Sequence, residues 1–218
     1  MYNTILFDLD GTLTESAQGI INSVLYALNK MNIPVRSDVD HQKFIGPPLH
    51  ESFKKYYDFD DESARNAVPI YREYFTTKGM FEAPLYDDVI KMLQTLKDHG
   101  KSLYVATSKP EVFAQKILNY VQADEYFTDI VGALLNETRL KKDEVIAHLL
   151  EKNNIRDLSE VIMVGDREHD IIGAKSFGID SIGVLYGYGD RDELETAGAT
   201  YIAETPMDIA EIILNADA

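Results

Sequence analysis

Short apolar runs that end in polar residues recur along the chain and predict buried strands. They lie in five places, near residues 3–8, 103–107, 129–133, 161–164 and 181–185. Between them, apolar residues repeat at helical spacing, as they do over 111–121 and 143–153. Strands that alternate with helices are typical of a doubly wound α/β fold, in which helices cover both faces of a parallel sheet. We therefore expect a Rossmann-like parallel sheet.

One long segment departs from this alternation, because its apolar residues follow helical spacing only. Ile20, Val24 and Leu28 form one stripe, and residues 63–78 carry a second stripe that includes Tyr71. Stripes of this kind are typical of helices that pack on one another. We expect residues 1–14 and 84–218 to form the α/β core, with residues 15–83 inserted as an all-helical domain.

The first strand ends in two carboxylates, Asp8 and Asp10, followed by Gly11. In open parallel sheets, ligands bind beyond the carboxyl ends of the strands, so these acids stand where chemistry is usually done. Magnesium prefers oxygen ligands, and it takes one or two carboxylates together with water and phosphate oxygens. The structural alternative is a capped strand end or a solvated turn.

Hydroxyl groups follow a second strand at Thr107 and Ser108, just before a helical pattern that starts at Glu111. Backbone N–H groups at a helix N-terminus bind phosphate, and a nearby hydroxyl adds a donor. An ordinary helix cap would show the same residues.

Acids return after the strand at 161–164, where Asp166 and Asp170 stand four residues apart. If a helix has begun by residue 166, these two carboxylates share one face and can jointly serve a metal. Lys141 and Lys142 precede the helical run at 143–153 and offer a fixed cation, although lysine pairs at a helix start are usually solvated.

The order of these four elements resembles that of the haloacid dehalogenase superfamily of phosphohydrolases. Its signature, Asp-x-Asp-Gly-Thr followed by an apolar residue, matches residues 8–13 without a gap, and the resemblance extends from residue 3 to about residue 190. It implies the following roles: Asp8 as nucleophile, Asp10 as general acid and base, Thr107 or Ser108 as the phosphate-binding hydroxyl, Lys142 (or Lys141) as the cation, and Asp8, Asp10, Asp166 and Asp170 as the site of Mg²⁺.

The resemblance also implies that the helical insert is a cap that closes over the site, a step that often limits turnover. The segment 44–50 resembles the cap loop that selects the leaving group in related enzymes. Lys43, Gly46 and His50 are therefore candidates for substrate specificity. Glu15 departs from the pattern, because many relatives have Asp at this hinge position.

These implications favour a magnesium-dependent phosphatase that hydrolyses a small phosphomonoester through an aspartyl-phosphate. A phosphoglycolate-like compound, a nucleoside monophosphate or a sugar phosphate would be the substrate. One alternative is a mutase of the β-phosphoglucomutase type, and another is phosphonate hydrolysis through a Schiff base on a cap lysine. A more distant alternative is a phospho-acceptor signalling module that resembles response-regulator receivers.

Composition narrows the expected partners and compartment. The 218 residues include no cysteine, which excludes a thiol nucleophile and a disulfide scaffold, and carry a net charge of −16. Such a charge opposes binding to nucleic acids and anionic membranes. No apolar run is long enough to span a bilayer, and the first residues do not resemble a signal segment. We expect a cytoplasmic monomer or homodimer whose partner is a small molecule.

Overall fold

The computed structural model describes residues 1–135 and 138–216, and the chain divides into two compact units. Met1–Glu15 and Leu85–Ala218 form one unit, called the α/β unit below, and Ser16–Pro84 forms the other, called the helical unit. Each boundary lies one residue from the one expected from the sequence. That the helical unit acts as a cap stays a prediction.

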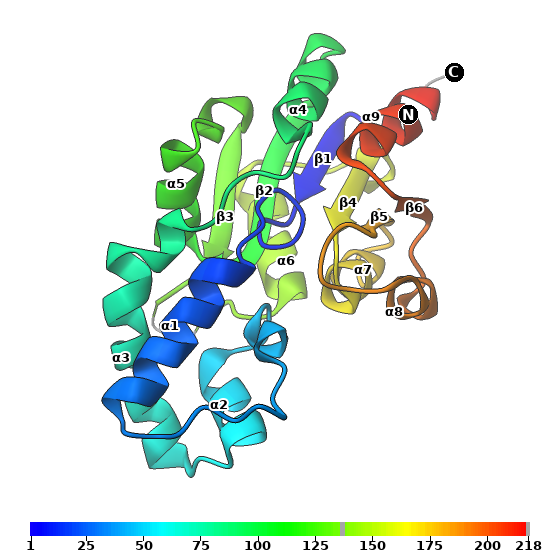
Figure 1. The fold of residues 1–218 in the computed structure, drawn as a ribbon. Helices are drawn as coiled ribbons and strands as arrows, with labels where there is room; N and C mark the ends of the chain where they lie inside the picture. Colours follow the sequence, from blue (N-terminus) through cyan, green and yellow to red (C-terminus); the bar gives the residue numbers. More distant parts are fainter. Residues whose placement is uncertain (136–137, 217–218) are drawn as a thin grey trace. The chain divides into compact units, whose positions relative to one another are not determined.

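The α/β unit contains a six-stranded sheet in the order β3-β2-β1-β4-β5-β6, and every neighbouring pair is parallel (Figure 1). The strands are β1 (Thr4–Phe7), β2 (Ser102–Pro110), β3 (Asp129–Ala133), β4 (Val161–Gly165), β5 (Asp180–Val184) and β6 (Tyr201–Ala203). This confirms the predicted doubly wound α/β fold. The sequence pattern missed β6, because three residues are too few to show a period.

Helices lie between the strands, and one more follows the last strand. They are α4 (Val89–Asp98), α5 (Glu111–Tyr120), α6 (Lys142–Lys152), α7 (Glu168–Lys175), α8 (Arg191–Ala197) and α9 (Pro206–Asn215), with short 3₁₀ turns at Asp124–Tyr126 and Leu158–Glu160. Because the strand order runs outward from β1 in both directions, right-handed crossovers place helices on both faces of the sheet. Accordingly, α4 packs against α9, and α6 packs against α7. Within residues 1–135 and 138–216, no helix has both the length and the apolar character needed to cross a membrane.

The core of the α/β unit explains why the central strands read as continuous apolar runs. Leu6, Tyr104 and Met163 come from β1, β2 and β4 and pack with Ile146 and Leu149 of α6. Helices cover such a sheet on both faces, so its central strands need no polar alternation. The strand β1 lies between β2 and β4, and its carboxyl end is therefore at the middle of the sheet.

The helical unit consists of α1 (Ala17–Lys30), α2 (Leu49–Tyr57) and α3 (Asp61–Thr77), with 3₁₀ turns at His41–Phe44 and Gly79–Phe81. The helix α3 packs against both α1 and α2. Aromatic rings fill the space beside α2, where Phe44 and Phe53 meet edge to face at 5.2 Å between ring centroids. The stripes read from the sequence at 20–28 and 63–78 lie mainly on α1 and α3.

A glycine contact inside the helical unit gives a stability prediction. Gly19 of α1 faces Gly79 so closely that a Cβ at position 19 would collide with the Gly79 carbonyl oxygen. Gly→Ala in a helix normally stabilises by about 1 kcal/mol. Here backbone atoms block the methyl group, so Gly19→Ala should instead destabilise by about 1–3 kcal/mol. Urea unfolding followed by circular dichroism measures the difference.

Asn66→Ala is the matched control, because Asn66 is exposed in the middle of α3. Its gain in helix propensity should raise the urea midpoint slightly. A raised midpoint for Gly19→Ala as well would show that α1 and Gly79 do not pack as described.

Candidate active site

The proposed nucleophile, Asp8, directly follows the central strand β1. Its backbone N–H donates to the Val164 carbonyl of β4 at 2.9 Å, which continues the parallel hydrogen-bond ladder by one residue. The side chain therefore stands at the carboxyl edge of the sheet on a backbone that neighbouring strands hold in place.

A tight turn follows Asp8 and reverses the chain. The N–H groups of Leu13 and Thr14 both donate to the Leu9 carbonyl, at 2.9 and 3.0 Å. Gly11 has φ +82°, and a Cβ at this position would collide with the Asp166 carboxylate. Glycine is therefore required here both by backbone conformation and by space.

Asp166 lies between β4 and α7, and Asp170 lies in the first turn of α7. The helix begins only at Glu168, so Asp166 precedes it, and the two acids do not share a helical face as the spacing suggested. Asp170 instead turns back over the helix start, where its Oδ2 accepts from the Arg167 N–H at 3.1 Å. Asp166 Oδ2 accepts from the Tyr188 N–H at 2.8 Å.

Lys142 is buried at the first turn of α6, and its ammonium group is surrounded by acceptors. Its Nζ lies 2.9 Å from Asp8 Oδ1 and 2.7 Å from Asp170 Oδ1, and it donates to the Ala106 carbonyl at 2.8 Å. Three N–H donors thus face three oxygens. Burial alone would lower the pKa of Lys142, but Asp170 and Asp8 outweigh it and raise that pKa. Lys141 is exposed, so the structure brings Lys142 to the acids.

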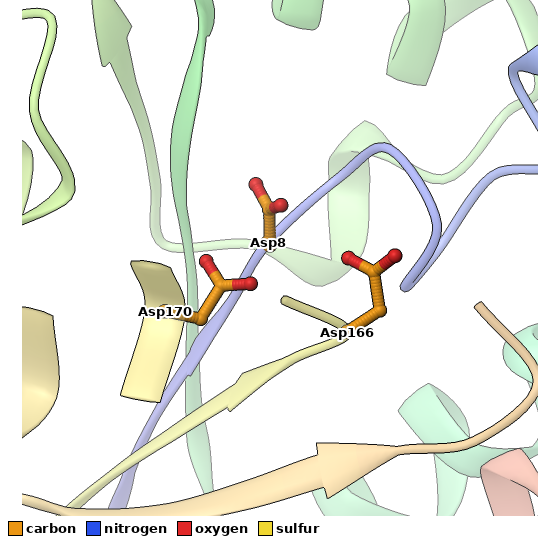
Figure 2. Close-up of side chains that lie close together, drawn as sticks. All are labelled: Asp8, Asp166 and Asp170. Carbon is orange, nitrogen blue, oxygen red and sulfur yellow. The ribbon is translucent and has the colours of Figure 1, made fainter. Parts of the chain in front are cut away.

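Figure 2 shows the side chains of Asp8, Asp166 and Asp170 lying close together. One oxygen from each lies within 4.8 Å of the other two. Burial and the charges of Asp170 and Asp8 raise the pKa of Asp166 well above its ordinary value. Burial also raises the pKa of Asp170 to about 6, even though the ammonium of Lys142 acts in the opposite direction.

This group of three acids has the chemistry of a site for a divalent cation. Ionisation of all three carboxylates, which a bound cation favours, leaves two negative charges that the single ammonium of Lys142 does not compensate. Asp166 Oδ1 is buried and has no hydrogen-bond partner, although buried oxygens are rarely left so. Carboxylate oxygens are hard ligands that suit magnesium. The residues present therefore fit Mg²⁺.

Asp10 is not a member of this group of three acids. Its carboxylate instead meets the ammonium of Lys109, with Nζ 2.8 Å from Oδ1 and 2.6 Å from Oδ2. The exposed fractions of the two side chains are 6% for Lys109 and 14% for Asp10. Sequence reasoning missed Lys109, and its place two residues after Thr107 is the signal that could have indicated it.

Thr107 and Ser108 lie at the carboxyl end of β2, close in sequence to the Ala106 carbonyl that holds Lys142. The strand runs on to Pro110, immediately before α5, and its pairing with β3 shifts register between Thr107 and Pro110. Thr107 is buried, and its hydroxyl oxygen accepts from the Lys109 N–H at 3.2 Å. That bond leaves the hydroxyl hydrogen free to donate. Phosphate binding by either residue stays a prediction.

Tyrosines that the sequence did not single out surround the turn after β1. The Tyr186 hydroxyl donates to the Thr12 carbonyl at 2.9 Å, and its ring meets that of Tyr86 edge to face at 4.9 Å. Burial, with the charge of Asp166, raises the pKa of Tyr186, so this hydroxyl stays protonated at neutral pH. The pair fixes the turn to the segment after β5.

The residues expected to select the substrate belong to the helical unit. Lys43 and Gly46 are exposed, and His50 is half-buried, with Nε2 3.3 Å from Glu51 and 3.5 Å from Asp61. Glu15 is exposed at the end of the first segment of the α/β unit. Their roles in specificity and closure stay predictions.

Comparisons with known proteins agree with this geometry. The chain is 42% identical to a 5'-nucleotidase from Pseudomonas aeruginosa over 200 residues, which cover 92% of this chain and 90% of that protein. It is 38% identical to the tyrosine-protein kinase PtkA of Mycobacterium tuberculosis over 199 residues, covering 91% and 67%. The crystal structure of a predicted phosphatase from Clostridium acetobutylicum matches with a TM-score of 0.91 at 48% identity, covering 99% of both chains.

The model of the haloacid dehalogenase-like hydrolase family matches residues 5–184, a range that contains every acid and both lysines of the site. This confirms the resemblance found in the sequence. The chain belongs to the haloacid dehalogenase-like hydrolase family and is an enzyme of that family.

Proposed function

We propose that this chain is a magnesium-dependent phosphatase that hydrolyses a small phosphomonoester through an aspartyl-phosphate on Asp8. The observation that carries the proposal is the group of three acids, two of them buried, in which Asp8 also touches the Lys142 ammonium. A phosphomonoester carries close to two negative charges at neutral pH, so a carboxylate nucleophile needs cations beside it.

Each residue has a distinct task in this mechanism. Asp8 attacks phosphorus and forms an acyl phosphate, which splits one difficult displacement into two easier steps. Lys142 holds Asp8 in place and offsets charge on the phosphoryl oxygens. Asp10 gives a proton to the leaving alcohol and later takes one from the attacking water, and Thr107 or Ser108 donates to a phosphoryl oxygen.

The metal site supports the first step. Bound to Asp8, Asp166 and Asp170, Mg²⁺ would neutralise charge on the phosphoryl group and so reduce its repulsion of the carboxylate. Arg167 and Tyr188 hold the outer oxygens of Asp170 and Asp166 through their backbone N–H groups. Such outer contacts orient the ligating carboxylates.

The substrate class follows from relatives rather than from the acids themselves. One relative is named a 5'-nucleotidase, and another, 25% identical over 217 residues, is named a phosphoglycolate phosphatase. We therefore propose a nucleoside monophosphate, a phosphoglycolate-like compound or a sugar phosphate as substrate, with the helical unit as the cap that selects it.

A second outcome of the same chemistry is transfer to a hydroxyl in place of water. One relative is named a tyrosine-protein kinase, which supports this alternative. A mutase would also transfer the phosphoryl group to a hydroxyl. The two outcomes differ in where the phosphoryl group goes. A phosphatase releases it as inorganic phosphate, whereas a transferase keeps it on an organic acceptor.

Substitution of the proposed nucleophile tests the reaction. Asp8→Asn should abolish phosphate release from a panel of nucleoside monophosphates, phosphoglycolate and sugar phosphates in the presence of Mg²⁺. Asp10→Asn should lower it by about 10²–10⁴-fold, the usual contribution of general acid–base catalysis. A coupled assay for inorganic phosphate measures both, and chromatography of the organic products detects transfer to a hydroxyl.

Asp98→Asn is the matched control, because Asp98 is exposed at the end of α4. It should keep full activity. Phosphate release that survives in Asp8→Asn would eliminate the aspartyl-phosphate mechanism, and organic phosphorylated products without phosphate release would replace the phosphatase with a transferase.

Removing one acid of the site tests magnesium binding without any substrate. Asp166→Asn relieves repulsion among buried carboxylates, so the Tm of the metal-free protein should rise. Binding of Mg²⁺ should stabilise the unsubstituted protein by about 2.7 kcal/mol at a hundred times the Kd and so raise its Tm. The same change should remove most of that increase in Tm.

Thermal unfolding with and without Mg²⁺, at equal ionic strength set with NaCl, measures this directly. Matched ionic strength separates binding from general screening of the acidic chain. An equal Mg²⁺ effect on both proteins would show that Asp166 does not hold the metal.

A further inference from the structure

The ion pair between Lys109 and Asp10 has a geometry that goes beyond charge neutralisation. The ammonium of Lys109 lies within 2.8 Å of both oxygens of one carboxylate. Rotation of a carboxylate about its last bond is ordinarily soft, because this torsion joins an sp³ and an sp² carbon. A donor that bridges both oxygens removes that freedom and fixes the plane of the carboxylate.

The backbone around Lys109 is built to aim its side chain. The register of β2 against β3 shifts between Thr107 and Pro110, so Ser108 and Lys109 form an irregular bulge. Bulges of this kind re-aim side chains next to active sites. Gly132 of β3 makes room for the bulge, because a Cβ there would collide with the Lys109 carbonyl oxygen. The Lys109 N–H is held by the Thr107 hydroxyl oxygen.

From these contacts we infer that Lys109 is a positioning residue for the general acid and base. With Lys109 on one lone pair of each Asp10 oxygen, another lone pair of the carboxylate is left to carry the proton that passes to the leaving-group oxygen and is later taken from water. Lys109 fixes the direction of that lone pair, and it does so from the same strand that carries the proposed phosphate-binding hydroxyl. This inference rests on the proposed function, since it assigns Lys109 to the proton-transfer step of that reaction. A displacement of about 1 Å in a catalytic group can cost about 10²-fold in rate.

The test compares esters that differ in their need for a proton. Alkyl phosphates lose a poor leaving group and depend on Asp10, whereas p-nitrophenyl phosphate loses a stabilised phenolate without protonation. Lys109→Met should lower kcat/KM for the alkyl ester by about 10²-fold and for p-nitrophenyl phosphate only a few-fold. Lys109→Arg, which keeps the charge and the donors, should recover part of the loss.

A double substitution separates positioning from other roles. If Lys109 acts through Asp10, then Asp10→Asn with Lys109→Met should be no slower on the alkyl ester than Asp10→Asn alone. A lysine that bound the substrate phosphate would instead raise KM for both esters and add its effect to that of Asp10→Asn. Equal losses on both esters, or additive losses, would overturn the inference.

Lys101→Met is the matched control, because Lys101 is a buried lysine next to the opposite end of β2. It should leave the ratio of kcat/KM for the two esters unchanged. If the unsubstituted protein hydrolyses neither ester, the proposed function fails and this inference fails with it. If the unsubstituted protein is active and Lys109→Met has the same ratio of kcat/KM for the two esters, only the inference fails.

Discussion

Repulsion among buried carboxylates is the constraint on which the site depends. Two like charges 4 Å apart cost about 4 kcal/mol at an effective dielectric constant of 20. One oxygen from each of Asp8, Asp166 and Asp170 lies within 4.8 Å of the others, and Lys142 touches two of these acids. The fold holds this arrangement because β1 and β4 end at one edge of the sheet and α6 and α7 begin there. Packing of the central strands therefore maintains a charge density that isolated side chains would not adopt.

The two acids of the signature sequence reach different lysines because the chain turns between them. In a continued strand, residues two apart would point to the same face. The strand ends at Phe7, however, and the following turn sends Asp10 to Lys109 while Asp8 meets Lys142. A nucleophile and a general acid need different surroundings, and the turn provides them over two residues.

The sequence predicted the parallel sheet because its buried strands are apolar runs that end in polar residues. Such a pattern can be read from a few consecutive residues. It could not predict β6, which has three residues, or the late start of α7 after Asp166, which depends on where a cap forms. At the site, the acids were indicated because they follow apolar strands. Lys142 was indicated only by the family resemblance, with Lys141 as the alternative, because its burial depends on how α6 packs. Lys109 was missed because its role depends on a register shift in β2, and a register shift leaves no mark on hydrophobic periodicity.

The choice between water and a hydroxyl as acceptor is not fixed by the group that forms the acyl phosphate. An aspartyl-phosphate on Asp8 can pass to either, and relatives with names as different as 5'-nucleotidase and tyrosine-protein kinase are both about two-fifths identical to this chain. The surroundings of the group that activates the acceptor bear on this choice. In this chain that group is proposed to be Asp10, whose two oxygens are both engaged by Lys109. If Lys109 positions Asp10, the approach of the acceptor depends on the lysine as well as on the acid.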